Sequence, residues 1–470
     1  MATAQYRQEP FWRWFFEKYP DWRNVFANIL LFAPFGFSVG WRLEAKRISW
    51  PAALLLTCLA SGAFSFCIEL TQNFMPTRTS SWVDVLANTA GGPLGWIVFR
   101  AMGQGIDRLL SAFLDAFLRV FSAEFLGGLF VVYSVLGIAI SIPLSRLAML
   151  SNWDVSYPLV LGNVSYGGRP WMGQVLELTI LDRAVSSAEA EGRVSSSGLA
   201  SIAGGHVVAS YEFSGSAPAV DKSGHSPVLL WKPRIPPDGT DKAAAGGKFE
   251  LRGPWLQSEG PASILEGRIR DANQFSLFIV CATHQAVQPG LNPILVLGPD
   301  LDRSNLSLLQ FYPSLVLRVR SPLTGPAGEI AEYRVSRLFG TPGQHAILFT
   351  YQGGRMRSYV DGKPGYESEL GPGAALFRHV RWLHQYETPG YKFVYYGLIL
   401  GPLGCMLAFA AKATGRLSTA AIGCGLFAPA IILEPILAVA SHRPLHTSNV
   451  FLGVGWTIGT YVFFRRYLPR

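Results

Sequence analysis

The sequence is poor in charged residues, and those it has are unevenly spread. Only 15% of the 470 residues are charged and 49% are hydrophobic, a balance between that of soluble proteins and that of fully membrane-embedded ones. Apolar runs fill the first 150 and the last 80 residues, whereas residues 151–385 are rich in glycine, proline, serine and charge. The composition therefore excludes a single soluble domain and indicates two environments.

Cysteine is also scarce. Cys58, Cys67, Cys405 and Cys424 lie in the apolar runs, which leaves Cys281 alone in the middle region. An internal disulfide is excluded there, but a region of roughly 230 residues can bury enough core without one. The N-terminus also lacks a short apolar run that ends in a small-residue cleavage site, so we expect the first hydrophobic span to be retained.

Seven runs are long and apolar enough to cross a bilayer, for which a helix needs about 20 residues. Four precede the middle region and three follow it: residues 24–41, 50–70, 82–102, 125–144, 391–411, 417–440 and 448–464. Ahead of them, aromatic side chains alternate with charged ones, which is typical of an interfacial helix. The sequence therefore predicts a polytopic α-helical membrane domain of about seven spans.

The formal charge of +9 is explained by where the basic residues lie. They cluster in loops that all fall on one side of the predicted spans: Arg42, Lys46, Arg47, Arg100, Arg108, Arg119, Lys412, Arg416, Arg465, Arg466 and Arg470. By the positive-inside rule that side is cytoplasmic. The middle region and the loops that carry Arg78 and Arg443 are therefore predicted outside, and the charge needs no nucleic-acid partner.

An internal repeat runs through the spans. The matching positions are Pro34 and Pro402, Gly36 and Gly404, Glu69 and Glu434, Arg78 and Arg443, and Asp84 and Asn449. Because each unit has three spans and the fourth span restores the orientation, we predict two parallel repeats.

The second copy of the repeat looks degenerate. Leu437, Asn449 and Gly453 stand where the first copy has Gln72, Asp84 and Asn88. We therefore expect any chemistry to lie in the first copy. Each copy also has glycines at the four-residue spacing that permits close helix packing, namely Gly91 and Gly95, and Gly455 and Gly459.

Polar side chains of the first copy converge near the outer ends of two spans. Glu69 and Gln72 share a face of one helix, Asp84 and Asn88 share a face of the next, and Arg78 lies between them. Such groups are costly in lipid unless they pair. Three interpretations stay open: an ion-pair clasp that fixes the turn, capture of a phosphate or carboxylate by Arg78, and general-base catalysis by a carboxylate beside Arg78.

These motifs resemble the VanZ-like membrane family. The resemblance covers roughly residues 20–105 and rests on the run of residues 28–37, on Glu69-x-x-Gln72, on Phe74-x-Pro76-x-Arg78 and on Asp84 to Gly91. It implies a bacterial cell-envelope membrane protein, and the family's namesake is associated with low-level teicoplanin resistance. The residues that match the family pattern are Asn28, Glu69, Gln72, Arg78, Asp84 and Asn88, whereas Tyr396 stands where the second copy would repeat Asn28.

The middle region has the short, β-branched or alternating runs of an antiparallel sandwich. Residues 351–355 and 359–363 are predicted hairpin loops. Its motifs resemble a LamG-like, concanavalin A-like jelly roll: Tyr211-x-Phe213, Val220-Asp221-x-Ser223-Gly224, Gly343-Gln344-His345, Tyr359-Val360-Asp361-Gly362, and a closing segment Trp171-x-Gly173 to Ser186. The closing segment precedes the opening one, as a circular permutation would produce.

Domains of this shape commonly bind carbohydrate or protein, but fold alone does not decide function. Asp221, Asp302 and Asp361 could contribute to a calcium site, but we interpret them as turn residues. Trp171, Trp231 and Trp255 could stack on sugar rings, but we interpret them as core residues. His442 and His446 flank Pro444 and favour a turn over a metal site, so we expect no metal and no cofactor.

Four domains are predicted: an interfacial segment (1–23), a VanZ-like membrane domain (24–150), a LamG-like sandwich (151–388) and the degenerate repeat (389–470). Our leading hypothesis is a protein of the bacterial cytoplasmic membrane, without strong enzymatic activity, that engages an anionic or lipid-linked glycan through Arg78. The sandwich would lie outside and bind carbohydrate or protein. The alternatives are an enzyme that acts on a lipid-linked envelope precursor through Glu69, Arg78 and Asp84, and a structural membrane adaptor.

Overall fold

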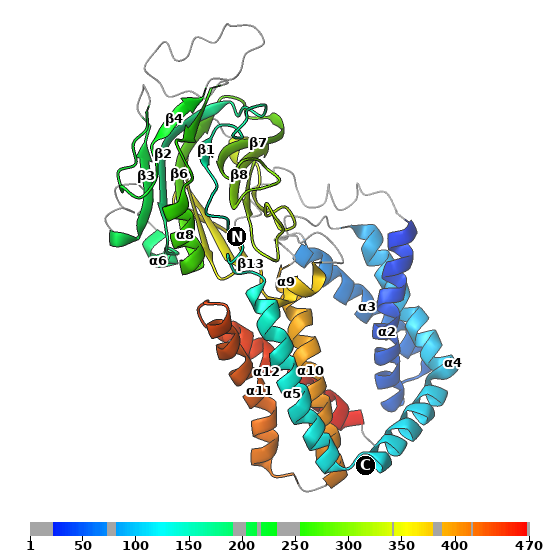
Figure 1. The fold of residues 1–470 in the computed structure, drawn as a ribbon. Coiled ribbons are helices and arrows are strands. Elements are labelled where there is room, and N and C mark those ends of the chain that lie inside the picture. Colours follow the sequence, from blue (N-terminus) through cyan, green and yellow to red (C-terminus); the bar gives the residue numbers. More distant parts are fainter. Residues whose placement is uncertain are drawn as a thin grey trace. The chain divides into compact units, whose positions relative to one another are not determined.

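The computed structural model describes residues 22–72, 81–190, 204–213, 218–232, 254–340, 343–378, 388–414 and 417–467. The chain divides into two compact units. The N-terminal unit contains helices α2 (Trp22–Ala45), α3 (Trp50–Gln72) and α4 (Trp82–Val120) (Figure 1). The C-terminal unit contains a β-sandwich, α11 (Thr419–Ala440) and most of α5 (Ala123–Arg146), α10 (Thr388–Thr414) and α12 (Thr447–Tyr467). Most of the predicted interfacial segment lies outside the described residues.

Five helices among the described residues are long and apolar enough to cross a membrane. They are Asn24–Ala45, Trp50–Leu70, Ala123–Arg146, Thr388–Thr414 and Thr419–Ala440. The chain is therefore a multi-pass membrane protein with a β domain inserted between its helices. The other two predicted spans are also helical, within α4 and α12, but polar side chains such as Asp84 and Asn449 reduce the apolar character of both helices.

Glycines bring α2 and α4 of the N-terminal unit into backbone contact. A Cβ atom added at Gly36 would lie 2.0 Å from the carbonyl oxygen of Gly92, and one added at Gly95 would lie 1.8 Å from that of Ala33. No larger side chain fits at either position. A Cβ atom at Gly91 would lie 2.4 Å from the carbonyl oxygen of Ile29, so Gly91 and Gly95 do mediate close packing, as their spacing predicts.

The first and third helices of the C-terminal group, α10 and α12, meet in the same way. A Cβ atom at Gly404 would lie 2.1 Å from the carbonyl oxygen of Thr457, and the Thr460 hydroxyl donates to the Gly401 carbonyl at 2.8 Å. These four residues occupy the positions that the repeat pairs with Gly36, Gly92, Gly95 and Ala33.

The prediction for the other two glycines of α12 is wrong. A Cβ atom at Gly455 or Gly459 would meet no described atom within 4 Å. The repeat pairs Gly91 with Trp456 instead, and Trp456 packs on Gly397 of α10. In the first copy the small residue, Gly91, lies on the third helix, whereas in the second copy the small residue, Gly397, lies on the first helix. The four-residue glycine spacing of α12 therefore does not mark its contact face.

The contrast between Gly404 and Gly455 gives a direct test of the helix contact. We expect Gly404→Ala to push α10 away from α12 and to lower the thermal midpoint of the detergent-solubilised chain, with a cost of about 1–3 kcal/mol typical of overpacking. Gly455→Ala adds the same methyl group to the same helix pair without a clash and should leave the midpoint unchanged. Equal midpoints for the two variants would contradict the contact.

The middle region is a sandwich of two antiparallel sheets (Figure 1). The seven-stranded sheet has the order β10 (Tyr333–Val335), β9 (Ser314–Val319), β8 (Leu306–Tyr312), β7 (Gln288–Leu297), β1 (Leu159–Leu161), β5 (Trp255–Ser258) and β4 (Leu229–Lys232). The six-stranded sheet has the order β13 (Lys363–Glu369), β12 (Arg355–Val360), β11 (Gln344–Gln352), β6 (Gln274–Thr283), β2 (Gly173–Leu181) and β3 (Val207–Glu212). Short helices α6 (Ser187–Ala190), α8 (Ser263–Ala272) and α9 (Pro372–Phe377) complete it.

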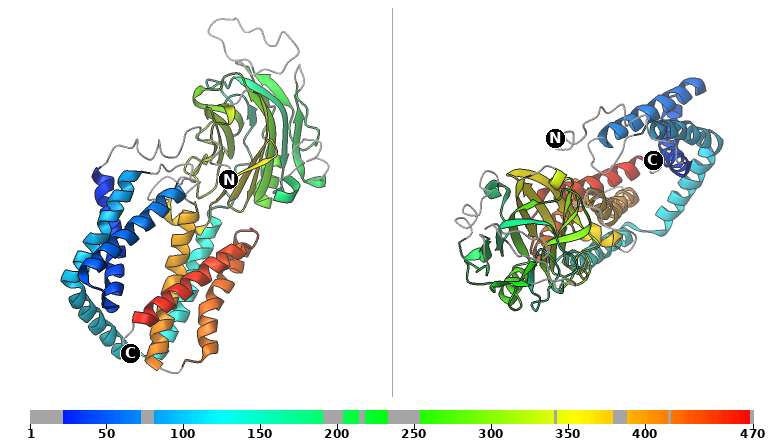
Figure 2. Two further views of the ribbon diagram at one scale, coloured as in Figure 1. Left: turned by 180° about the vertical axis from the view of Figure 1, so that it is seen from behind. Right: turned by 90° about the horizontal axis from the view of Figure 1, so that it is seen from above.

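Inward-facing side chains of the two sheets form one continuous core, which includes Phe275, Leu308 and Phe349. This core explains how the domain is stable without a disulfide, since Cys281 is a free, buried thiol. Views from behind and from above show the two sheets facing each other, with α5, α10, α11 and α12 extending from one end of the sandwich (Figure 2).

Both predicted hairpins are confirmed. Strand β11 pairs with β12, and β12 with β13. The turn residues Gly353, Gly354, Asp361 and Gly362 all have positive φ, which matches tight hairpin turns. The segments predicted to close and open the domain lie side by side, because β2 pairs with β3 through Leu178 and Tyr211.

Candidate polar sites in the two membrane units

The buried carboxylate of the N-terminal unit belongs to Glu69 of α3. Its side chain is 1% exposed and accepts a hydrogen bond from the backbone N–H of Ser81 at 2.9 Å. On the facing helices, the Asn28 amide donates to Asp84 at 2.9 Å. The structure thus brings α2, α3 and α4 together through their polar residues. The side chain of Gln72 and the whole of Arg78 lie outside the described residues.

A polar stripe that the sequence analysis missed extends from Glu69 along α3. It comprises Thr57, Ser61, Ser65 and Glu69, which are spaced by four residues and fully buried or nearly so. Asn88 of α4 donates to the Ser65 hydroxyl at 2.9 Å, and its own carbonyl oxygen has no partner among the described residues. The four-residue spacing could have revealed the stripe, because such positions share one face of a helix.

The matching positions of α11 are apolar apart from the carboxylate. Ile422, Leu426 and Ala430 stand where α3 has Thr57, Ser61 and Ser65, and Glu434 stands where it has Glu69. Polar groups inside a membrane domain are costly. Along this face, α3 therefore carries more buried polar side chains than α11.

Glu434 is the centre of the second polar cluster and is completely buried. The Arg443 guanidinium holds both of its oxygens, at 2.7 and 3.0 Å. Asn449 donates to one oxygen at 3.0 Å and the Tyr396 hydroxyl to the other at 2.7 Å. The backbone N–H of His446 approaches at 3.4 Å. The carboxylate is thus saturated by internal donors, an arrangement suited to structure and unsuited to proton abstraction.

The β-sandwich rests on the loop that carries Arg443. A Cβ atom at Gly353, in the β11–β12 turn, would lie 2.7 Å from Cβ of Arg443. Asn273 follows α8 in the left-handed conformation and donates to the Ser441 carbonyl at 3.0 Å. It also accepts from the backbone N–H of Leu150 at 2.8 Å. One asparagine therefore links the end of α8, the segment after α5 and the α11–α12 loop.

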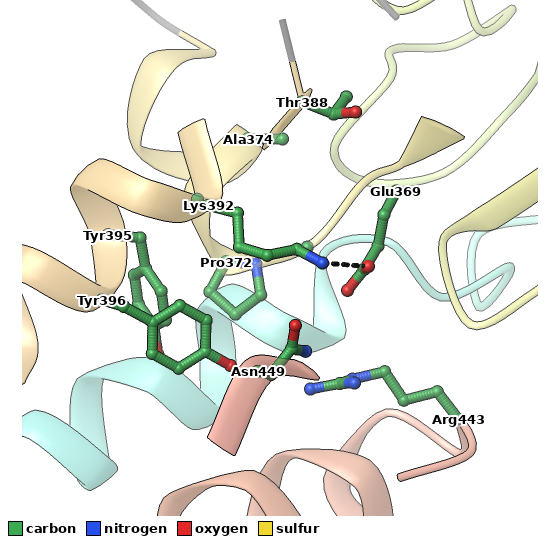
Figure 3. A pocket seen from close by; sticks show the side chains of 11 residues that line it. Glu369, Pro372, Ala374, Thr388, Lys392, Tyr395, Tyr396, Arg443 and Asn449 are labelled. Carbon is green, nitrogen blue, oxygen red and sulfur yellow. Dashed lines mark hydrogen bonds and ion pairs between the residues drawn. The ribbon is translucent and has the colours of Figure 1, made fainter. Parts of the chain in front are cut away.

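A small pocket lies beside this cluster, between the β13–α9 segment and the first turns of α10 and α12 (Figure 3). Its lining residues are Glu369, Gly371, Pro372, Gly373, Ala374, Thr388, Lys392, Tyr395, Tyr396, Arg443 and Asn449. Lys392 and Glu369 form an ion pair across it at 2.5 Å. The free space is about 10 Å³, enough for about one water molecule.

The electrostatic surroundings fix the charge of two groups at this end of the helices. Burial alone would raise the pKa of Glu369, but Lys392 and then Arg443 outweigh it, and the pKa lies below its ordinary value. The pKa of His446 is lowered, first by burial and then by Arg355 and Arg443, against the opposing effect of Glu369. At neutral pH the Lys392–Glu369 pair near Arg443 is therefore charged, and the His446 imidazole of the same loop as Arg443 is neutral.

Three of the candidate ligand residues of the sandwich have structural roles. Asp221 accepts four backbone N–H groups, from Ser210, Ser223, His225 and Ser226, which is typical of a turn. Trp171 and Trp255 are buried, so neither ring offers a free face to a sugar. The described residues contain no group of three or more His, Cys, Asp or Glu side chains that could hold a metal.

Apolar helices, a polar cluster at helix ends and an inserted two-sheet domain define a multi-pass membrane protein with a β-sandwich. Residues 2–103 match the family model described as VanZ/LLP1. This match covers α2, α3 and the first half of α4, where the resemblance to the VanZ-like family was predicted. No curated protein and no solved structure matches the chain. The LamG-like identity of the sandwich stays a prediction.

Proposed function

We propose that the chain is a non-enzymatic protein of the bacterial cytoplasmic membrane that binds an anionic, lipid-linked glycan through Arg78 of its first repeat. The proposal includes seven membrane spans, with two parallel three-span units joined through the fourth span. The sandwich would lie outside the cell. The sandwich, of LamG-like type, would present a surface for carbohydrate or protein. The second repeat would serve chiefly to seat the sandwich.

The observation that carries this proposal is the buried polar stripe of the first unit, which the second unit lacks at the matching positions. The first keeps Ser61, Ser65 and Asn88 in addition to its carboxylate, whereas the second has apolar residues or glycine at the same positions. A membrane protein retains buried polar groups chiefly where they serve function. This supports the first unit as the binding copy.

Equivalent helix contacts support the common origin of the two units. Gly36 meets the carbonyl of Gly92, and Gly404 meets that of Thr457, at matching positions. The Asn28 amide and the Tyr396 hydroxyl, also at matching positions, each donate to a carboxylate, although the acceptors differ: Asp84 of α4 and Glu434 of α11. Divergence of roles after duplication is then the simplest account of why only one copy keeps the polar stripe.

Binding of a defined lipid tests the proposal. We expect the purified chain in phosphatidylcholine nanodiscs to bind a polyprenyl diphosphate that carries one sugar, and Arg78→Ala to weaken binding by about 10–100-fold, because charge-assisted, two-point contacts are lost. Arg78→Lys keeps the charge without the planar fork and should fall between. Arg108→Ala removes an exposed cation from α4 and is the matched control.

The same experiment separates the alternatives. Release of phosphate or sugar by the wild type, lost in Glu69→Gln with the fold retained, would identify an enzyme. A lower thermal midpoint in Arg78→Ala without any bound lipid in the wild type would identify a structural adaptor. The saturated Glu434 cluster favours the adaptor role for the second copy, so that outcome would extend the role to both copies.

A further inference from the structure

The pocket beside the Glu434 cluster contains a buried hydrogen-bond acceptor that the protein does not use. Asn449 is 1% exposed, and its amide nitrogen donates to Glu434 at 3.0 Å. A carboxylate only accepts, so the NH₂ group must face Glu434 and the carbonyl oxygen must face away from it. That oxygen has no partner among the described residues. In Figure 3 it points toward Pro372 and Lys392, into the pocket.

The charges of the pocket walls are cancelled in pairs. Lys392 is bound to Glu369 and Arg443 to Glu434, so an entering ion would find no uncompensated counter-charge. The Lys392 ammonium has three hydrogens, which leaves donors beyond the one given to Glu369. The entering group should therefore be neutral, donate to Asn449 and accept from Lys392. Within about 10 Å³, a hydroxyl meets these requirements.

The pocket lies where helices end. Thr388 and Lys392 belong to the first turns of α10, and Asn449 to the first turn of α12. The ends of membrane-spanning helices fall at the level of the lipid headgroups. Hydroxyls available there belong to polyol headgroups and sugars.

We propose that this pocket is a second binding site, which takes one hydroxyl of a polyol headgroup or sugar against the Asn449 carbonyl oxygen. The site is formed by the β13–α9 segment together with α10 and α12. The site does not include Arg78, so the test of this proposal is separate from the test of glycan binding by the first repeat.

Two anionic lipids, of which only one carries hydroxyls in its headgroup, test the site. The purified full-length chain is placed in phosphatidylcholine nanodiscs with equal amounts of phosphatidylglycerol and phosphatidylmethanol, and retained lipids are counted by native mass spectrometry. The site predicts retention of phosphatidylglycerol in about fivefold excess, the preference expected of one hydrogen bond. Equal retention would overturn the proposal and leave a bound water as the occupant.

Variants locate the effect. Asn449→Leu should abolish the preference, while Ser448→Leu, an exposed neighbour on α12, should keep it. Because Asn449→Leu also removes a bond to Glu434, Ala374→Leu is the second variant, since it fills the pocket without touching that bond. A preference that survives in Ala374→Leu would contradict the site. Free glycerol that displaces phosphatidylglycerol would identify a soluble polyol as the ligand, and resistance to glycerol would identify the lipid headgroup.

Discussion

Replacing Glu434 with glutamine is expected to destabilise the C-terminal unit by about 3–5 kcal/mol. The substitution leaves the Arg443 guanidinium buried without its counter-charge, and an uncompensated buried charge is costly. Arg443 lies in the α11–α12 loop against the β11–β12 turn, and its side chain is 6% exposed, so it cannot easily reach water. Circular dichroism and tryptophan fluorescence of the detergent-solubilised chain, heated in parallel, should show a large fall in the unfolding midpoint.

Two further variants show whether the buried charge is the cause. Glu367→Gln removes a carboxylate that pairs with Arg355 and Arg357, and the Glu367 side chain is 43% exposed. This substitution should lower the stability by no more than about 1 kcal/mol. Adding Arg443→Gln to Glu434→Gln should recover part of the loss, because no buried charge then remains. A double variant less stable than the single one would show that hydrogen-bond geometry matters more than charge.

Replacing Glu266 with glutamine is expected to stabilise the β-sandwich at alkaline pH. Glu266 lies on α8 and is completely buried. One of its oxygens accepts from Asn305 at 2.8 Å, and the other has no partner among the described residues. Burial raises the pKa of the carboxyl from 4.5 to about 8, so the folded protein keeps it protonated at neutral pH.

The pH dependence follows from this shift. Because the pKa is higher in the folded chain than in the unfolded one, the stabilisation is complete below pH 4.5 and is lost as the pH rises toward 8. The loss at pH 8 amounts to roughly 4 kcal/mol. Glutamine imitates the protonated acid, so Glu266→Gln should unfold at nearly the same temperature at pH 5 and pH 8.

Thermal melts of the wild type at the two pH values supply the comparison. The wild type should melt markedly lower at pH 8 than at pH 5. Glu259→Gln, an exposed glutamate shortly before α8, should behave like the wild type. Identical pH slopes in the wild type and Glu266→Gln would show that this carboxyl does not titrate on unfolding.

The sequence predicts the fold class because the relevant signals are local. Hydrophobic runs of helix length give the five membrane helices, and the Gly353-Gly354 and Asp361-Gly362 turns fix two hairpins through positive φ. Similarly, the predicted core position of Trp171 agrees with its burial. Each of these follows from a few neighbouring residues.

The polar sites were harder to predict because they depend on contacts between distant segments. Tyr396 counted only as a departure from Asn28, yet its hydroxyl completes the Glu434 cluster from another helix. The pocket requires Glu369, from the last strand of the sandwich, to meet Lys392 of α10. The Gly455 prediction failed for a related reason, since the contact face of α12 is set by its partner helix.

In the C-terminal unit, the sandwich separates α5 from α10, α11 and α12 in the sequence, and this order affects how the unit is synthesised and assembled. Tyr133 of α5 donates to the carbonyl of Leu398 at 2.6 Å, and Arg146 reaches that of Ala440 at 3.4 Å. Both partners are made after the whole sandwich has been synthesised. At about 5–20 residues per second, α5 waits roughly 10–50 s for them. The sandwich can therefore fold before the helix group assembles, and mistimed translation of residues 151–388 should leave α5 exposed to quality control.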